Sequence, residues 1–313
     1  MNRRYFLGAA GAGLAALHIQ ALTGCSTSAV PAVGATGVGM CDWNLGEYPN
    51  PDLISLAQEA HLEGIQVSIG TRPDNIPLRE REVRRKYLEL GRKHGITFHS
   101  VAAGSILNSI PLATEPQSAV YVIDAIEAAA VLGAGNILLA FFGRGDLRKR
   151  DEEGNLIERQ EGEFKSYALN DENVTRVVEA LRQIVPRAKD AGVIIGIENT
   201  LTAKQNLQII DRIGSDIAQV YYDVGNSWGS GYDVPGEIRM LGNDMICEVH
   251  LKDWNTSVLG SDEGMVDMAA CARALDDIGY NKWLVLETSG RRDRFLEDTR
   301  ANVAFVKETF VMA

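Results

Sequence analysis

Four ionisable residues stand at the ends of four short apolar runs in the second half of the chain. They are Glu198, Asp223, His250 and Glu287. A charged group in an apolar strand is costly to bury without a partner, and three neighbouring carboxylates repel one another unless a cation lies between them. Three oxygen ligands and one imidazole suit one divalent metal ion, with Mn²⁺ first and Mg²⁺, Co²⁺ or Zn²⁺ as alternatives. The other reading is a buried polar network in which Lys252 or an arginine supplies the positive charge.

Further residues near these positions are candidates for substrate binding. They are His99, Asn226, Lys252 and Trp254. His99 comes near the predicted end of the third apolar run, and Lys252 shares a strand face with His250 because side chains alternate along a strand. Structural roles compete with each assignment. A lone histidine on a strand is commonly a core residue, Lys252 has Asp253 beside it for a salt bridge, and Trp254, like Trp43, is suited to aromatic packing.

Eight apolar runs alternate with segments of helical periodicity along most of the chain. The predicted strands cover residues 38–43, 65–69, 97–102, 136–142, 193–198, 218–224, 246–253 and 283–287. The predicted helices cover residues 51–61, 79–94, 117–132, 207–213, 235–241, 268–278 and 294–310. This alternation predicts parallel βα units, and strands that are apolar on both faces favour a closed (β/α)₈ barrel. A doubly wound open sheet is the alternative, but no glycine-rich dinucleotide motif follows the first strand.

In a (β/α)₈ barrel, functional side chains come from the carboxyl ends of the strands. We therefore expect the four ionisable residues to meet at one mouth of the barrel. The long charged segment 143–170 leaves the fourth strand at the same mouth. Long loops in this place are often lids over the active site, and a solvated excursion without a role is the other interpretation.

The order and spacing of these residues resemble a known family. Intervals of 25, 27 and 37 residues separate Glu198, Asp223, His250 (in a His-x-Lys-Asp run) and Glu287. The pattern is similar to that of the sugar phosphate isomerase/epimerase family, which has a xylose isomerase-like TIM barrel, and the resemblance covers residues 37–313. It implies a metal-bound keto-sugar, with Glu198 and Glu287 as the catalytic pair that removes and returns a proton.

Three departures from the family pattern limit what the resemblance implies. The family's arginine shortly after the histidine of the seventh strand is not evident, since Lys252 and Asp253 follow His250 closely. Asn226 stands where many ketose epimerases have histidine, and Gln66 stands where many members have glutamate. The ligand set does not choose between epimerisation, isomerisation and elimination, since all three begin with the same proton abstraction. The predicted function is a metal-dependent isomerase or epimerase of an unphosphorylated keto-sugar. The alternatives are a lyase or hydratase of 3-keto-glycosides and a non-catalytic carbohydrate-binding barrel.

The first 36 residues carry features of export. Residues 1–24 resemble a twin-arginine signal peptide and end in a motif similar to a lipobox, which implies lipidation of Cys25. An ordinary cleaved signal with an incidental cysteine is the alternative. Residues 25–36 are uncharged and predict a flexible tether before a barrel domain at 37–313. We expect an exported protein, periplasmic or anchored to the membrane, and hence a substrate without phosphate.

Composition excludes some classes of protein. The formal net charge is −11, and such an acidic surface argues against nucleic-acid binding and against a DNA-repair endonuclease of related fold. The remaining cysteines, Cys41, Cys247 and Cys271, match no zinc or disulfide spacing and are predicted to be buried free thiols. The sequence leaves open whether the protein forms a homo-oligomer.

Overall fold

Eight parallel strands form a closed barrel in a computed structural model, which describes residues 34–312 except 162–163 and 289–291. The strands are β1 (Gly37–Cys41), β2 (Gly64–Ser68), β3 (Thr97–Ala102), β4 (Asn136–Ala140), β7 (Ile194–Glu198), β8 (Ala218–Asp223), β9 (Ile246–Leu251) and β10 (Trp283–Leu286). Their order around the barrel is β1-β10-β9-β8-β7-β4-β3-β2. The predicted (β/α)₈ barrel is thereby confirmed.

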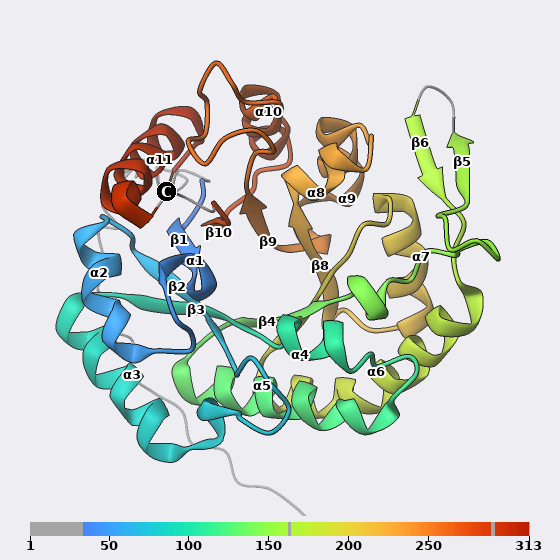
Figure 1. Cartoon of the computed structure of the whole chain (residues 1–313), viewed down its shortest axis with the longest axis horizontal. Helices are drawn as coiled ribbons and strands as arrows, with labels where there is room; N and C mark the ends of the chain where they lie inside the picture. Colours follow the sequence, from blue (N-terminus) through green and yellow to red (C-terminus); the bar gives the residue numbers. More distant parts are fainter. Residues whose placement is uncertain (1–33, 162–163, 289–291, 313) are drawn as a thin grey trace, which may run out of the picture. The chain divides into compact units, whose positions relative to one another are not determined.

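Helices surround the barrel (Figure 1). They are α1 (Asp42–Leu45), α2 (Ile54–Glu59), α3 (Arg81–His94), α4 (Gly104–Ser109), α5 (Ala119–Leu132), α6 (Asp171–Ala191), α7 (Ala203–Ile213), α8 (Val224–Gly229), α9 (Val234–Met245), α10 (Met268–Asp277) and α11 (Phe295–Thr309). Several of these helices begin or end at a capping residue. Asn170 accepts a hydrogen bond from the Asn173 amide at the start of α6, and Gly192 ends that helix in the left-handed conformation.

The predicted elements differ from the observed ones mainly at strand ends. Trp43 and Phe142 are apolar and were predicted in strands, but both lie beyond the last residue of their strand. A barrel strand ends where its neighbours stop hydrogen bonding, and the apolar residues that follow pack over the mouth. The 21-residue helix α6 was not among the predicted helices, although its buried valine, leucine and isoleucine residues recur with helical spacing.

The segment 143–170 contains an antiparallel hairpin, β5 (Glu158–Glu161) and β6 (Phe164–Tyr167), where the sequence predicted a loop. Its base is held to the barrel because Gln205 Nε2 on α7 donates to the Tyr167 carbonyl at 2.7 Å. Figure 1 shows the hairpin projecting at the edge of the barrel beside α7.

The predicted signal at 1–24 and Cys25 lie outside the described residues. Within the described part of the chain, no helix is both long and apolar enough to cross a membrane. Cys41, Cys247 and Cys271 are buried free thiols, as the sequence predicted. Just before β1, the Ala35 amide donates to the Val311 carbonyl at 2.8 Å, so the contacts of the barrel begin two residues ahead of that strand.

Candidate metal centre

Four adjacent strands bring the four ionisable residues together at the mouth of the barrel. Glu198 ends β7, Asp223 ends β8, His250 lies near the end of β9 and Glu287 follows β10. One ligand atom from each residue lies within 4.8 Å of the others. The predicted convergence follows from the fold, because parallel strands end at the same rim.

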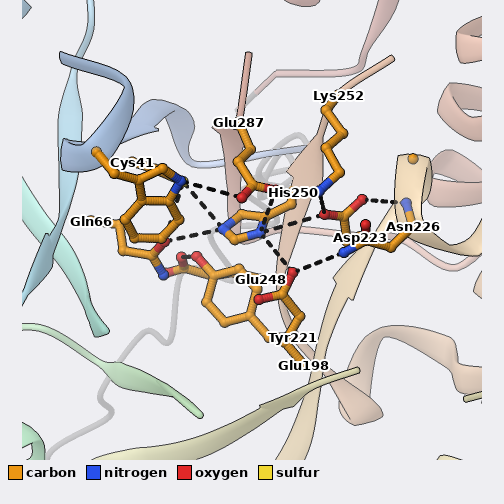
Figure 2. A network of polar contacts seen from close by, with 12 residues as sticks. Cys41, Gln66, Glu198, Tyr221, Asp223, Asn226, Glu248, His250, Lys252 and Glu287 are labelled. Atoms are coloured by element: carbon orange, nitrogen blue, oxygen red, sulfur yellow. Dashed lines mark hydrogen bonds and ion pairs between the residues drawn. The ribbon is translucent and has the colours of Figure 1, made fainter. Parts of the chain in front are cut away.

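His250 lies at the centre of this cluster (Figure 2). Its Nδ1 is 3.3 Å from Glu198 Oε1, 3.6 Å from Glu287 Oε2 and 3.9 Å from Asp223 Oδ2. Burial alone would lower the pKa of His250, but the three carboxylates outweigh it and raise the pKa from 6.5 to about 8. Burial also raises the pKa of Asp223. The cluster therefore favours positive charge at its centre.

Lys252 supplies part of that positive charge. Its ammonium nitrogen lies 2.7 Å from Glu287 Oε2 and 2.8 Å from Asp223 Oδ2. Burial would lower the pKa of Lys252, yet the neighbouring carboxylates hold it well above its ordinary value. The alternative drawn from the sequence, Lys252 as counter-charge, is thus present in the geometry. One ammonium does not neutralise three carboxylates, so the cluster retains a negative charge that a cation would balance.

The donor set fits a divalent metal ion. Asp223 Oδ1 accepts the Asn226 backbone N–H at 2.8 Å, while its buried Oδ2 lies 2.8 Å from Lys252 Nζ. In Glu287, Oε1 accepts the Trp43 indole N–H at 3.2 Å and Oε2 turns towards His250. Each of these carboxylates thus has one oxygen that accepts an N–H and one that faces both Lys252 and His250, and carboxylate oxygens suit a hard or borderline cation.

A cleft adjoins the cluster, and Glu198 and Glu287 form part of its wall. Its cavity volume is about 170 Å³, which is below the range of drug-sized ligand sites. Its other lining residues are Trp43, Tyr48, Ser68, Ala102, Gly104, Ser105, Asn108, Leu138, Ala140 and Phe142. Gly104, Ser105 and Asn108 lie in the short helix α4 after β3, which was not among the predicted helices. Only the position of Trp43, near the end of the first strand, gave a signal.

His99 does not join the cluster, so its predicted location was wrong. It is the third residue of β3, which runs on to Ala102, and its ring stacks on Trp283 with ring centroids 4.8 Å apart. Its Nδ1 contacts Glu248 Oε2 at 2.8 Å. His99 lines a hollow with Asn281 and other residues at the amino ends of the strands, the opposite end of the barrel from the cleft.

The other predicted substrate-binding residues lie closer to the centre. Asn226 Nδ2 donates to Glu198 Oε1 at 3.3 Å, and Lys252 contacts two of the acids as described. Trp254 is 56% exposed, and its indole N–H donates to the Gly225 carbonyl. Trp254 therefore packs on α8, and the described lining of the cleft does not include it.

The fold and the cluster define a class of protein, a (β/α)₈ barrel with a candidate metal site at the carboxyl ends of its strands. Residues 54–309 match the xylose isomerase-like TIM barrel family, and the chain belongs to this family. No curated protein is significantly similar to it in sequence.

Solved structures share its fold at low sequence identity. D-Psicose 3-epimerase from Clostridium cellulolyticum H10, solved with D-tagatose, has a TM-score of 0.70 at 15% identity, covering 88% of this chain and 100% of that one. 3-Keto-D-glucoside 4-epimerase from E. coli has a TM-score of 0.68 at 13% identity, covering 87% and 99%. The IolI protein with a bound zinc atom has a TM-score of 0.61 at 14% identity, covering 88% and 96%. At these identities the likeness concerns the fold alone.

Proposed function

We propose that this protein is a divalent-metal-dependent isomerase or epimerase that abstracts a proton next to the carbonyl of an unphosphorylated keto-sugar. The observation that carries the proposal is the convergence of three carboxylates and one imidazole within 4.8 Å at the barrel mouth. The similar structures include epimerases of psicose and of 3-keto-glucoside, which supports a sugar substrate. Mn²⁺ suits the donor set best, and Mg²⁺, Co²⁺ or Zn²⁺ are alternatives.

The site residues would have two roles, metal binding and proton transfer. Glu198, Asp223, His250 and Glu287 would hold the ion, which when bound polarises a neighbouring carbonyl and acidifies the adjacent C–H. Figure 2 shows Glu198 and Glu287 reaching His250 from opposite sides. One glutamate can remove a proton from one face of a carbon and the other can return a proton to the opposite face, which is epimerisation. The Asn226 amide and the Trp43 indole orient these glutamates.

Lys252 is the candidate for binding a substrate oxygen. Its Nζ lies beside Glu287 Oε2, and its side chain keeps 22% of its surface exposed. Asn226 can hydrogen-bond but cannot carry a proton, so the proton shuttle of this proposal consists of the two glutamates. A second candidate reaction is elimination from a 3-keto-glycoside, which starts with the same abstraction. The likeness to a 3-keto-glucoside epimerase favours testing it.

The test is solvent exchange. Protein loaded with Mn²⁺ is incubated in D₂O with D-psicose, D-tagatose and 3-keto-glucosides, and deuterium next to the carbonyl is measured by NMR. We expect exchange that Glu287→Gln abolishes while the unfolding temperature is kept, and Glu297→Gln on α11 serves as a surface control. Exchange retained in Glu287→Gln would remove Glu287 as a base. Release of a free aglycone would identify the lyase, and absence of exchange with every substrate would favour a binding barrel.

We also propose export and a lipid anchor at Cys25, from the resemblance of residues 1–25 to lipoprotein signals. An exported enzyme rarely meets sugar phosphates, which is the reason for an unphosphorylated substrate. In cells that process such signals, the wild-type protein is expected in the membrane fraction and Cys25→Ala in the soluble fraction. Membrane association that is the same in both would overturn the anchor.

A further inference from the structure

The ring of His250 has a second nitrogen that faces away from the carboxylates. His250 Nε2 lies 3.1 Å from Gln66 Oε1 and 3.4 Å from Cys41 Sγ. The three residues have 0% relative exposure, and they come from β9, β2 and β1. Figure 2 shows Gln66 on the side of the ring opposite Asp223 and Lys252. The two ring nitrogens therefore face two different environments.

The side-chain amide of Gln66 is fixed in one orientation. Its Nε2 donates to Ser100 Oγ at 3.0 Å on β3, and its oxygen points the other way, towards the imidazole. Cys41 Sγ lies 3.3 Å from the same oxygen and donates to it. With the amide held in this way, the group that meets His250 Nε2 is a hydrogen-bond acceptor.

From this geometry we infer that Gln66 is a positioning residue for the metal centre, an inference that rests on the proposed metal site. A neutral imidazole carries its proton on one nitrogen and a lone pair on the other. An acceptor at Nε2 keeps the proton there and leaves the lone pair on Nδ1, which faces Glu198, Asp223 and Glu287. Buried acceptors of this kind orient histidine ligands and commonly change metal affinity by about 10–100-fold.

The amide also suits the charge of its surroundings. A carboxylate at position 66 would accept the same hydrogen bond but would add a fourth acid to a buried cluster that already holds three. Gln66 gives the acceptor without the charge. Gln66, which replaces the family's glutamate, thus has a role in orienting His250 that the sequence alone did not suggest.

The experiment measures Mn²⁺ affinity of the full chain by titration against a chelating indicator, with no substrate present. Gln66→Leu removes the acceptor and is expected to weaken Mn²⁺ binding by about 10–100-fold. Gln66→Glu restores the acceptor and is expected to regain most of that affinity. Asn136→Leu is the matched control, because Asn136 is a buried interior amide that donates to Glu248 Oε1 at 2.7 Å and serves no metal ligand. It should leave Mn²⁺ affinity unchanged.

A second readout reports the ring directly. In the Zn²⁺-loaded protein, ¹⁵N NMR of His250 should show a proton on Nε2 in the wild type and in Gln66→Glu. Wild-type affinity in Gln66→Leu, or a proton-free Nε2 in the wild type, would overturn the inference while leaving the metal site standing. Failure of the wild type to bind any of the four candidate ions would instead overturn the proposed function. If Gln66→Leu does not fold, Ser100→Ala, which releases the amide, should weaken binding in the same direction, and unchanged affinity there would count against the inference.

Discussion

The ammonium of Lys252 and a bound dication would use the same two oxygen atoms. Lys252 Nζ contacts Glu287 Oε2 and Asp223 Oδ2, and both oxygens are directed towards His250 Nδ1. In the protein without metal the lysine moderates repulsion among buried acids. When an ion binds, positive charges this close to each other repel. Lys252 is therefore expected to stabilise the metal-free protein and to oppose metal binding.

Lys252→Met should separate these two effects. We expect a metal-free protein that is less stable by about 1–3 kcal/mol, because partly buried carboxylates lose their counter-charge. We expect its Mn²⁺ affinity to rise, since the ammonium no longer competes for the oxygens. Urea denaturation and Mn²⁺ titration measure the two quantities. Lys307→Met is the control, because Lys307 pairs with Glu63 at the surface, where ion pairs contribute about 0–1 kcal/mol. Weaker Mn²⁺ binding in Lys252→Met would mean that the lysine helps assemble the site.

At the scale of single residues, the sequence predicted the candidate metal ligands but not the residues that orient them. Glu198, Asp223 and His250 could be found because a charged residue at the end of an apolar strand is conspicuous. The role of Gln66 could not, since a contact across the barrel depends on how far each strand is staggered against the others. His99 was misplaced although the strand was predicted with its observed bounds, because His99 is only the third residue of β3 and was treated as if it lay at the carboxyl end.

Among the elements, the turn from β1 into α1 shapes the cleft. Asp42 begins α1 and accepts hydrogen bonds from both the backbone N–H and the hydroxyl of Ser68, each at 2.7 Å, which ties this turn to the end of β2. The next residue, Trp43, then reaches Glu287. The apolar character of Trp43 predicted a strand, but the buried hydrogen bonds of Asp42 favour a helical turn instead. Local pattern could not show this, because the partner Ser68 lies 26 residues away.

Glycines on β1 and β2 leave room for the ring of His99 on β3. A methyl group added at Gly39 of β1 would lie 2.3 Å from His99 Nε2, and one added at Gly64 of β2 would lie 2.8 Å from His99 Cδ2. Both positions therefore require glycine, because any larger side chain would overlap the His99 ring. The stacked rings of His99 and Trp283 occupy the space that these glycines leave free.

Gly39→Ala is expected to destabilise the protein by about 1–3 kcal/mol, because the added methyl group overpacks the interior. Urea denaturation of the metal-free protein measures the loss. In the double variant with His99→Ala the clash is absent, so the two effects should be coupled by about 0.5–3 kcal/mol. Gly135→Ala is the control, since a methyl group there would have no described heavy atom within 4 Å. Additive effects in the double variant would contradict the assigned contact.

Across the whole molecule, acidic residues outnumber basic residues, with 42 Asp and Glu against 31 Lys and Arg. The net charge is −11, and four acids outside the metal cluster are buried among the described residues, namely Asp42, Glu237, Glu248 and Asp298. Burial raises the pKa of Asp42 from 3.8 to about 7 against the hydrogen bonds of Ser68, and it raises the pKa of Glu237 from 4.5 to about 7 against those of Ala203 and Tyr222. The barrel class could be predicted from strand alternation alone. The raised pKa values of Asp42 and Glu237 could not be predicted, since burial is a property of the assembled fold.

Asp42 and Glu237 bind protons more tightly in the folded than in the unfolded chain. Their stabilising contribution is therefore complete at acidic pH, declines as pH rises above their unfolded values near 4, and is lost above about 7. The free energy of unfolding of the metal-free protein should fall between about pH 4 and pH 7. A pKa difference of about three units corresponds to at most about 4 kcal/mol for Asp42. Urea denaturation at several pH values, with a chelator present, measures the slope.

Asp42→Asn tests whether ionisation of Asp42 causes the fall in the free energy of unfolding with pH. The asparagine oxygen can still accept the Ser68 backbone N–H, and its amide can donate to the Ser68 hydroxyl, so the turn into α1 retains its connection to β2. The variant cannot ionise, so its stability should fall less steeply with pH than that of the wild type. Adding Glu237→Gln should flatten the curve further, because the two acids lie on different helices, α1 and α9. Equal slopes in all three proteins would show that neither carboxyl keeps its proton in the folded barrel, and the pH dependence would then have to come from the metal cluster itself.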